Sequence, residues 1–484
     1  MTPASIYQSL KEHAGAEPAR PIVEFYDLQI SRQQLVEQID QYRSVLAQDW
    51  AGQQVAILLP TDPSTLALYV ALLSIGCNAQ VMNVDWPQSI IQQTIWSVKS
   101  ALVICENEPL PEFQDTEVLT IEELDEIGKT SKVQELIDPS SARYTCFTSG
   151  STGSPKGCVR TERSWVNSFN AEKSISHLSS EDTVMIIGNF SHSLFLYAAA
   201  HALFVGAGIV IFSSFHPLRI WNKIHSARSA VIYAVPTQID ALVAAAKAGS
   251  STVRCILSTG SKLSEALVAR VPGVFKNTEI IEFYGTSELS YVTSRIPDKS
   301  HKETFVGWPV TGVEISILDP QGQPCDLNIS GYVHIESLMK FEGYMRDRIL
   351  LPFRGSFTAG DIGYLDQSGG LHLVGRGDRM FQSSGHNIIP EEIERALLSI
   401  EGIDQAAVIG RPDDRRGKKI VSIICLSDRL SRRDIIGCLR NLLPQYAIPT
   451  LFLICNKWPT TVSCKTDYEV LKGFVSKDTL EYLR

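Results

Sequence analysis

Short apolar segments alternate with helix-forming segments over most of the chain, and this alternation limits the possible folds more than any other feature. Strands are predicted at residues 55–60, 144–148, 184–187, 209–212, 231–235, 255–258 and 280–284, with a further strand led by Val81 and Met82. A helix is predicted from Asp62 to Ile75, stopped by Gly76, and further helices are predicted to start near Pro217, Thr237 and Ser264. Strands that alternate with helices form parallel sheets whose faces the helices cover. The sequence therefore predicts an α/β fold.

The pattern changes after Gly307 and again after Arg376. In between, short segments at 313–319, 331–337 and 363–375 are separated by Gly, Pro and Asp turns, which indicates antiparallel strands in a small barrel-like region. Beyond Arg376 the predicted elements are a helix at 390–398, strands at 406–409 and 420–426, a helix at 432–443 and a strand at 451–455. About a hundred residues are enough for one small domain. We therefore expect domains at 1–376 and 377–484.

The composition is that of an ordinary globular protein, and its charge opposes a large nucleic-acid-binding surface. The 484 residues are 44% hydrophobic and 20% charged, and they are too many for one core. The formal net charge of -9 opposes broad contact with a polyanion. The ten cysteines form no C-x-x-C pair and no zinc-like cluster, so we expect buried, reduced thiols. With the polar N-terminal segment MTPASIYQSLKEH, this predicts a cytoplasmic protein.

One apolar stretch, residues 194–212, is long enough to span a bilayer. It is apolar apart from His201, and Gly206 and Gly208 divide it. A covered parallel sheet requires such segments, so we expect a buried helix followed by a short buried strand. No transmembrane segment is expected, while peripheral contact with a membrane stays open.

The strongest local signal for chemistry is the segment FTSGSTGSPKG at residues 147–157. It follows a predicted strand, and its backbone N–H groups and hydroxyls can surround phosphate oxygens while Lys156 adds a positive charge. It is not a Walker A loop, because Pro155 stands where that loop has its second glycine. It does not form the G-x-S-x-G turn of serine hydrolases either. The alternative to a phosphate-binding loop is a solvated Gly/Ser loop.

Two further groups of residues suit a nucleotide. Residues 282–288, EFYGTSE, end a predicted strand, where ligands of open α/β sheets bind. An aromatic ring there could lie on a purine, and a carboxylate could hold Mg²⁺. The second group comprises GDIG at 360–363, GRGDR at 375–379, SGHN at 384–387 and PEEIE at 390–394. Alone, these residues would equally fit turns and surface ion pairs.

In this order, the segments resemble those of the adenylate-forming superfamily: acyl- and aryl-CoA synthetases, peptide-synthetase adenylation domains and firefly-type luciferases. Residues 148–157 match its T-S-G-[ST]-T-G-x-P-K-G signature, and residues 284–288 are similar to Y-G-x-T-E, with Ser287 for Thr. The later segments resemble T-G-D, with Ala359 for Thr, then G-R-x-D-[DR] and G-x-N-[IV]-x-P-x-E-[IV]-E. Residues 459–465 resemble P-R-T-x-S-G-K, with Thr460 for Arg and Cys464 for Gly. The likeness is strongest to acyl-CoA ligases.

The resemblance implies a large N-terminal domain of doubly covered sheets with a small barrel-like β region, and a small mobile α+β C-terminal domain. The ATP phosphates would be held by Thr148, Ser149, Gly150, Ser151, Thr152, Gly153 and Lys156. The rest of the nucleotide would meet Gly260, Ser261, Tyr284, Gly285, Thr286 and Ser287, with Tyr284 packed on adenine. Asp361 would accept hydrogen bonds from the ribose, assisted by Arg376, and Glu288 would ligate Mg²⁺.

The same resemblance implies two half-reactions. Lys465 would reach the substrate carboxylate and the α-phosphate, so that acyl-AMP forms and pyrophosphate leaves. Asp378 corresponds to a hinge about which the small domain would rotate. That rotation would withdraw Lys465 and bring the Gly385 loop to the acceptor thiol. The implied partners are ATP, Mg²⁺, a small carboxylic acid, and coenzyme A or the phosphopantetheine of a carrier protein.

The acid-binding stretch corresponds to NFSHS at residues 189–193. Amino-acid-activating members carry Asp where this chain has Ser191, and without it a buried ammonium group would be costly. His192 resembles the histidine that many CoA ligases carry there, and a core histidine is the alternative. The residues expected to line a lipophilic pocket are Phe190, Leu194, Phe195 and Val235. We therefore expect a fatty or aromatic acid with an uncharged tail, as in fatty acid metabolism.

Three functions stay open, of which an acyl- or aryl-CoA ligase is favoured. A stand-alone adenylation enzyme that loads an acyl or aminoacyl group onto a carrier protein shares the first half-reaction. A degenerate, non-catalytic binding or scaffold protein would explain Cys464, Ala359 and Ser287. Against it stand the retained Lys156, Glu288, Asp361, Arg376 and Lys465.

Overall fold

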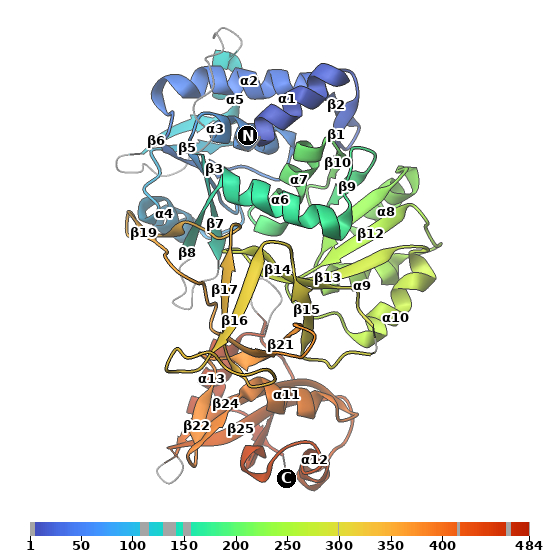
Figure 1. Cartoon of the computed structure of the whole chain (residues 1–484), viewed down its shortest axis with the longest axis vertical. Coiled ribbons are helices and arrows are strands. Elements are labelled where there is room, and N and C mark those ends of the chain that lie inside the picture. The colour runs from blue at the N-terminus through green and yellow to red at the C-terminus, as the bar shows by residue number, and fades with distance from the viewer. Residues whose placement is uncertain are drawn as a thin grey trace. The chain divides into compact units, whose positions relative to one another are not determined.

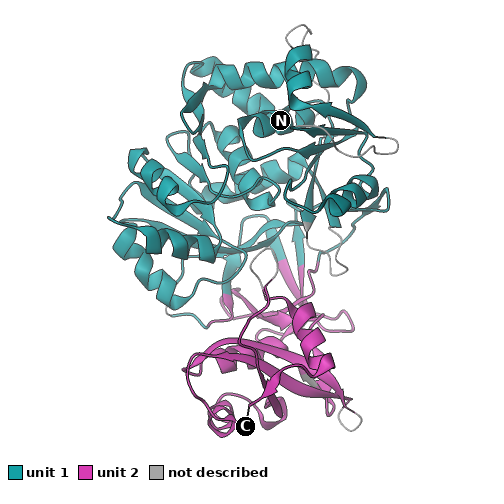
Figure 2. Cartoon of the chain, turned by 180° about the vertical axis from the view of Figure 1, so that it is seen from behind, with its two compact units in different colours: residues 1–302, 306–314, 335–357 teal, residues 303–305, 315–334, 358–484 magenta. Residues whose placement is uncertain are grey.

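The structure, a computed structural model, describes residues 5–106, 116–128, 142–148, 156–298, 300–413, 417–460 and 466–483 (Figure 1). The chain divides into two compact units (Figure 2). Unit 1 comprises residues 1–302, 306–314 and 335–357, and unit 2 comprises residues 303–305, 315–334 and 358–484.

The first sheet of unit 1 has a parallel centre, as predicted. Its strands lie in the order β14 (Ser290–Arg295), β13 (Glu279–Thr286), β12 (Val253–Ser258), β11 (Ala230–Ala234), β9 (Thr183–Ile186), β10 (Gly208–Ile211), β1 (Pro21–Phe25) and β2 (Leu28–Ser31). The strands from β13 to β1 pair in parallel, whereas β14 and β2 are antiparallel to their neighbours. The strand β15 (Phe305–Pro309) pairs with β14 through residues 308 and 309.

The second sheet of unit 1 combines a parallel centre with an antiparallel edge. Its order is β19 (Ile349–Pro352), β18 (Gly343–Arg346), β8 (Lys156–Thr161), β7 (Arg143–Thr148), β4 (Asn78–Val81), β3 (Gln54–Leu58), β5 (Leu102–Cys105) and β6 (Glu117–Thr120). The strands from β7 to β6 pair in parallel, and β8, β18 and β19 extend the sheet in antiparallel fashion. The described helices of unit 1 are α1 (Ile6–Ala16), α2 (Arg32–Asp49), α3 (Pro63–Ser74), α4 (Gln88–Ser97), α5 (Ile121–Gly128), α6 (Glu162–Ser176), α7 (Ser193–Val205), α8 (Pro217–Ser226), α9 (Pro236–Ala245) and α10 (Glu265–Val274).

Two almost wholly buried helices form the centre of unit 1. The helix α3 packs on β3 and β4 of the second sheet, and α7 packs on β9, β10 and β11 of the first. Nearly all their side chains are buried, and α1 contacts both helices. Because apolar residues occupy every face of α3 and α7, these helices are stable only where protein surrounds them. Because α1 contacts both, it links the helix on one sheet to the helix on the other.

The apolar stretch at 194–212 forms the predicted helix and strand, α7 and β10. Gly206 ends α7 in the left-handed conformation, with φ of 74°, and β10 begins at Gly208. Among the helices of the described ranges, none combines the length and apolar character that a membrane crossing requires.

The prediction that Val81 and Met82 lead a strand is wrong, because β4 ends at Val81. Two buried polar residues of β4, Asn78 and Gln80, obscure the strand in the sequence. Asn78 accepts a hydrogen bond from Thr145 at 2.8 Å, and the Gln80 amide donates to Gln54 at 2.9 Å. Residues on neighbouring strands thus provide hydrogen-bond partners for these buried polar side chains. From the local sequence alone, such side chains would be expected to face solvent.

The cysteine prediction holds for most of the thiols that the structure describes. All nine are free, and six of them are buried. Cys325 and Cys425 are half-buried and Cys438 is exposed, which the sequence did not indicate. Cys464 lies outside the described residues.

Unit 2 begins with an antiparallel region and continues as a small α+β layer. The strands β17 (Gly331–Ser337), β20 (Asp361–Leu365) and β21 (Leu371–Arg376) pair antiparallel, and β16 (Val313–Leu318) precedes them. A hairpin of β22 (Phe381–Ser383) and β23 (His386–Ile388) follows. The remaining elements are α11 (Pro390–Leu398), β24 (Ile403–Asp413), β25 (Gly417–Leu426), α12 (Arg432–Leu439), a 3₁₀ turn (Gln445–Ala447), β26 (Leu451–Ile454), α13 (Tyr468–Lys477) and β27 (Glu481–Tyr482).

The strand pattern of β24 explains why helices cover both faces of this last sheet. Ala406 and Val408 point to a core shared with α11 and α12. Ala407 and Ile409 point to the opposite core, which α13 completes. Successive side chains of a strand face opposite sides, so an uninterrupted apolar strand requires a cover on each.

Candidate active site

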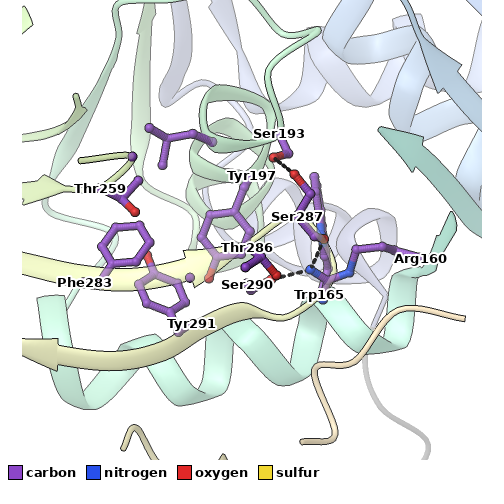
Figure 3. A pocket seen from close by; sticks show the side chains of 13 residues that line it. Arg160, Trp165, Ser193, Tyr197, Thr259, Phe283, Thr286, Ser287, Ser290 and Tyr291 are labelled. Atoms are coloured by element: carbon purple, nitrogen blue, oxygen red, sulfur yellow. Dashed lines mark hydrogen bonds between the residues drawn. The ribbon is translucent and has the colours of Figure 1, made fainter. Parts of the chain in front are cut away.

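A cavity of about 180 Å³ lies in unit 1 at the carboxyl ends of β12 and β13 (Figure 3). Strand ends and helices surround it, and its lining residues are Arg160, Trp165, Ser193, Leu194, Tyr197, Thr259, Gly260, Phe283, Gly285, Thr286, Ser287, Ser290 and Tyr291. In open α/β sheets this edge is where ligands bind. The structure thus brings the predicted segments around 259–261 and 284–288 to one cavity.

A close approach of the backbone in the β13–β14 hairpin shapes the cavity. A Cβ at Gly285 would lie 1.8 Å from the carbonyl oxygen of Ser290, so only glycine fits this position without a backbone shift. Gly260 has φ of 89°, and a Cβ there would lie 3.2 Å from Val235. Glycine at both positions leaves the cavity open between β12 and the hairpin.

Arg160 lines the cavity although no sequence pattern pointed to it. It comes from β8, and only 2% of the residue is exposed. Its guanidinium donates to the Ser164 hydroxyl at 3.2 Å, the Ser287 carbonyl at 3.1 Å, the Ser290 hydroxyl at 2.6 Å and the Met339 carbonyl. Burial lowers the pKa of Arg160 below its ordinary value. Its neighbours lie at positions 287, 290 and 339, so no local signal could have predicted this site.

A buried carboxylate lies behind the aromatic wall of the cavity. Glu172 accepts hydrogen bonds from Tyr291 at 2.7 Å, from Ser176 at 2.7 Å and from Tyr233, and its other close neighbour is His201 at 3.2 Å. Burial alone would raise the pKa of Glu172, but the charge of His201 and these hydrogen bonds outweigh it and lower the pKa to about 2. The hydrogen bond to Glu172 fixes the position of the Tyr291 ring, which is part of the cavity wall.

Glu288, the predicted Mg²⁺ ligand, follows the hairpin turn. Its Oε1 accepts a hydrogen bond from the Tyr344 hydroxyl at 2.7 Å, and its carbonyl accepts one from the Phe341 amide at 2.7 Å. Burial and the neighbouring Glu288 charge raise the pKa of Tyr344. These contacts fix the carboxylate at the turn that also carries Thr286 and Ser287.

Most of the predicted phosphate loop lies outside the described residues. Ser149, Gly150, Ser151, Thr152 and Gly153 fall there, as does Lys465. The two ends of the loop are described: Thr148 ends β7, Lys156 begins β8, and the two residues pair across the antiparallel ladder. The strand predicted before the loop is therefore confirmed as β7, while the role of the loop stays a prediction.

Several predicted residues lie beside the cavity rather than in its lining. His192 is the residue before α7, next to the lining residues Ser193 and Leu194. Desolvation of its imidazole ring lowers the pKa of His192. Tyr284 lies between the lining residues Phe283 and Gly285 on β13. Ser261 is exposed after Gly260. None of these placements tests the assigned roles, which stay predictions.

The four residues expected to line a lipophilic pocket can be compared with the lining of this cavity. Of these four, Leu194 is in the described lining of the cavity and the other three are not. Phe190 is fully buried, and Phe195 fills the space over Gly188, where a Cβ would lie 2.1 Å from its ring. Val235 lies behind Gly260. The aromatic lining comes instead from Trp165, Tyr197, Phe283 and Tyr291.

In unit 2 the structure brings Asp361, Arg376 and Asp378 together. Asp361 and Arg376 are partners across the β20–β21 ladder, with Nη1 and Oδ1 3.6 Å apart. The Nε of Arg376 also lies 3.3 Å from the Asp378 carboxylate. Asp361 is buried, whereas Asp378 is largely exposed. Gly385 has φ of 82° in the exposed turn between β22 and β23.

The residue after Asp378 is anchored to α11. Arg379 donates to Glu391 at 2.8 Å and to Glu394 at 2.5 Å, and its guanidinium stacks 3.7 Å from the ring centre of Tyr468. Burial lowers the pKa of Arg379, but the hydrogen bond and charge of Glu394 outweigh burial and raise it overall. The PEEIE segment thus supplies structural carboxylates.

Comparisons with known proteins agree with this geometry. The sequence model of the AMP-binding enzyme family matches residues 10–345, and that of the AMP-binding enzyme C-terminal domain matches residues 392–465. The chain is 31% identical to the uncharacterized acyl-CoA ligase YhfT of Bacillus subtilis, over 89% of each chain. It is 28% identical to VraA of Staphylococcus aureus, provisionally named a long chain fatty acid-CoA ligase, over 98% of this chain and 99% of VraA. Its fold is that of the o-succinylbenzoate CoA synthetase MenE of Bacillus subtilis, with a TM-score of 0.83 and 22% identity over 98% of this chain and 99% of MenE.

Proposed function

The chain belongs to the AMP-binding enzyme family, and from this premise we propose that it activates a carboxylic acid with ATP and then transfers the acyl group to the thiol of coenzyme A. In the first half-reaction a carboxylate oxygen attacks the α-phosphorus of ATP, and pyrophosphate leaves. In the second, the thiol sulfur attacks the acyl carbon, loses its proton, and AMP leaves. The names of YhfT and VraA support coenzyme A as the acceptor.

The cavity at the ends of β12 and β13 is the observation that carries this proposal. Residues from two segments implied by the resemblance, Thr259 with Gly260 and Gly285 to Ser287, line it together. An acid in the cavity would lie beside the turn that carries Glu288.

The residues present fit a magnesium nucleotide. The Thr286 hydroxyl is buried and has no hydrogen-bond partner among the described residues, which suits a polar ligand oxygen. In the described part of the chain no three His, Cys, Asp or Glu residues gather into a metal site. Magnesium is commonly held by one or two carboxylates and the phosphates of its nucleotide, so Glu288 suffices on the protein side. When bound, the metal would neutralise phosphate charge.

The remaining roles follow the family resemblance. Residues 148–153 and Lys156 would hold the phosphates, with Tyr284 on adenine and Asp361 with Arg376 on the ribose. Lys465 would stabilise charge on the carboxylate and α-phosphate oxygens. The functional division would lie between 1–376 and 377–484, with Asp378 as the hinge and Gly385 on the thiol side.

The acid belongs to the fatty or aromatic class under this proposal. The chain has no acidic side chain at position 191 for an α-ammonium group, and aromatic residues dominate the cavity wall. The neutral form of His192, which its lowered pKa favours, suits a contact with the bound acid.

Pyrophosphate release tests the function directly. With ATP, Mg²⁺ and a panel of acids, release should depend on the acid, and addition of coenzyme A should yield the acyl-CoA product by mass spectrometry. Glu288→Gln should lower acid-dependent release about a hundredfold, whereas Glu265→Gln, at an exposed position in α10, should not. Release that requires a carrier protein in place of coenzyme A would favour the carrier-loading enzyme. Absence of acid-dependent release would contradict adenylation itself.

A further inference from the structure

The cavity has room for about one ring. Its volume is about 180 Å³, and a closed apolar cavity of roughly 150 Å³ in a protein accommodates benzene. A long acyl chain needs a much longer channel.

The walls of the cavity favour a flat ring. Phe283 and Tyr291 lie with ring centres 4.3 Å apart, and Trp165 meets Tyr197 edge to face at 5.5 Å. Aromatic rings pack favourably against such surfaces in offset or edge-to-face geometry. Because Glu172 holds the Tyr291 hydroxyl from behind, that ring cannot swing aside without breaking a buried hydrogen bond to a carboxylate.

One side of this aromatic cavity carries a cation without a carboxylate in contact. Figure 3 shows the Arg160 guanidinium directed toward Ser287 and Ser290, with Thr259 and Phe283 on the opposite side. The four oxygens that Arg160 contacts belong to hydroxyls and backbone carbonyls, so each acceptor among the described residues is neutral.

The hydrogen bonds also leave part of the guanidinium unused. A guanidinium has five N–H groups, and the four contacts within the described residues use four of them. Burial of this cation is costly although the charge of Glu288 acts on it, and a ligand oxygen would offset part of that cost.

We propose that the acid is a single-ring aromatic carboxylic acid with a second oxygen-bearing substituent, a hydroxyl or a carboxylate, that accepts a hydrogen bond from Arg160. This inference rests on the proposed function and names its substrate class. Arg160 is then a specificity-determining residue, while its bonds to Ser287 and Met339 also hold the turn before Glu288. The same cavity would exclude straight-chain acids longer than the ring-sized space.

The test compares kcat/KM values of different acids with the same enzyme preparation. A general loss of activity then cancels in the ratio of two acids. The panel contains benzoate, the three hydroxybenzoates, the three benzenedicarboxylates, and straight-chain acids from butanoate to dodecanoate. In the wild-type protein, kcat/KM for pyrophosphate release should be at least about tenfold higher for one substituted benzoate than for benzoate. Comparison of hydroxyl with carboxylate at that position identifies the substituent. For straight chains, kcat/KM should fall beyond hexanoate or octanoate.

Arg160→Met provides the decisive variant. The ratio between the preferred substituted benzoate and benzoate should fall to about one, because methionine fills similar space without donors. If both acids lose activity equally, Arg160 serves only the hairpin or the reacting carboxylate, and the inference is overturned. If Arg160→Met does not fold, the wild-type ratios decide: no preferred substituted benzoate, or a preference for dodecanoate, refutes the proposal.

A binding measurement separates this inference from the proposed function. If no acid supports pyrophosphate release, adenylation has failed, but thermal shifts still report on the cavity. The preferred substituted benzoate should raise the Tm of the wild-type protein more than benzoate does, and the difference should vanish in Arg160→Met. Equal shifts in the wild-type protein would overturn the inference.

Discussion

At the scale of single residues, Glu162 is a buried carboxyl with only part of its hydrogen-bonding capacity used. Its Oε1 accepts a hydrogen bond from the Ile6 amide at 2.8 Å, and its Oε2 has no partner in the part of the chain that the structure describes. Burial raises the pKa of Glu162 from 4.5 to about 7. Because the folded pKa exceeds the unfolded one, the folded state binds the proton more tightly. The resulting stability is fully present below pH 4.5 and is lost as the pH rises through 7.

Glu162→Gln should therefore stabilise the protein in a pH-dependent way. Glutamine resembles the protonated carboxyl and removes the cost of a buried charge. Relative to the wild-type protein, its free energy of unfolding should rise between pH 5 and pH 8, by roughly 3 kcal/mol in total. Urea unfolding followed across this range measures the difference. Glu401→Gln, at an exposed position, is the control and should show little pH dependence. A constant difference for Glu162→Gln would mean that its carboxyl is charged throughout.

Lys465 has a role that only the family resemblance assigns, so its test must separate the two half-reactions. Lys465→Ala should lower acyl-AMP formation at least about a hundredfold, because a cation at the reacting oxygens stabilises the developing charge. Thioester formation from supplied acyl-AMP and coenzyme A should change little. Single-turnover assays of each step give the two rates. Lys457→Ala, an exposed lysine before the same segment, should leave both rates intact. Comparable losses in both steps would remove Lys465 from its proposed position.

At the scale of elements, Arg379 links the chain after β21 to α11 and α13. It contacts Glu391 and Glu394 of α11 and stacks on Tyr468, the first residue of α13. Glu394 also accepts a hydrogen bond from the Val408 amide at 2.7 Å, so β24 joins the same cluster. Four segments of unit 2 therefore meet at one ion-pair network.

Arg379→Met should destabilise unit 2 because it leaves two carboxylates of α11 without their counter-charge. Removal of one partner from a buried pair costs about 3 to 5 kcal/mol. Thermal unfolding should show a transition shifted down by several degrees. Arg433→Met, at an exposed position in α12, is the matched control and should shift it little. Adding Glu391→Gln and Glu394→Gln to Arg379→Met should recover part of the loss. Absence of recovery would indicate that packing on Tyr468, rather than charge, dominates.

The elements also show what a sequence can predict. The helix α11 was predicted with its bounds because Pro390 suits the first turn and the apolar positions recur at helical spacing. The strand β4 was misplaced because its buried polar side chains find partners on other segments. Likewise, Arg160 in a strand looks like a solvent-facing residue until residues 287, 290 and 339 surround it. Local patterns fix elements, but burial of polar groups depends on contacts distant in the sequence.

At the scale of the whole molecule, the two proposed half-reactions need different residues at one nucleotide site. The proposed rotation would take place at Asp378, and unit 2 gives this position a suitable setting. The preceding Arg376 belongs to the β21 ladder, and the following Arg379 is held by α11. Asp378 itself is largely exposed, and its described ion pair is with Arg376. A short exposed link thus separates two anchored residues, as a hinge requires.

Asp378→Pro should uncouple the two half-reactions. Proline fixes φ near -65° and also restricts the residue before it, so rotation about this link would be blocked. Acid-dependent pyrophosphate exchange should stay within about threefold of the wild-type rate, whereas acyl-CoA formation should fall at least about tenfold. Asp378→Ala is the matched control: it removes the ion pair with Arg376 but keeps the rotation, so both rates should persist. Together the two variants separate the charge of Asp378 from the freedom of its backbone. If acyl-CoA formation survives in Asp378→Pro, the hinge lies elsewhere. If Asp378→Ala loses acyl-CoA formation as much as Asp378→Pro does, the second half-reaction needs the carboxylate of Asp378 rather than the rotation.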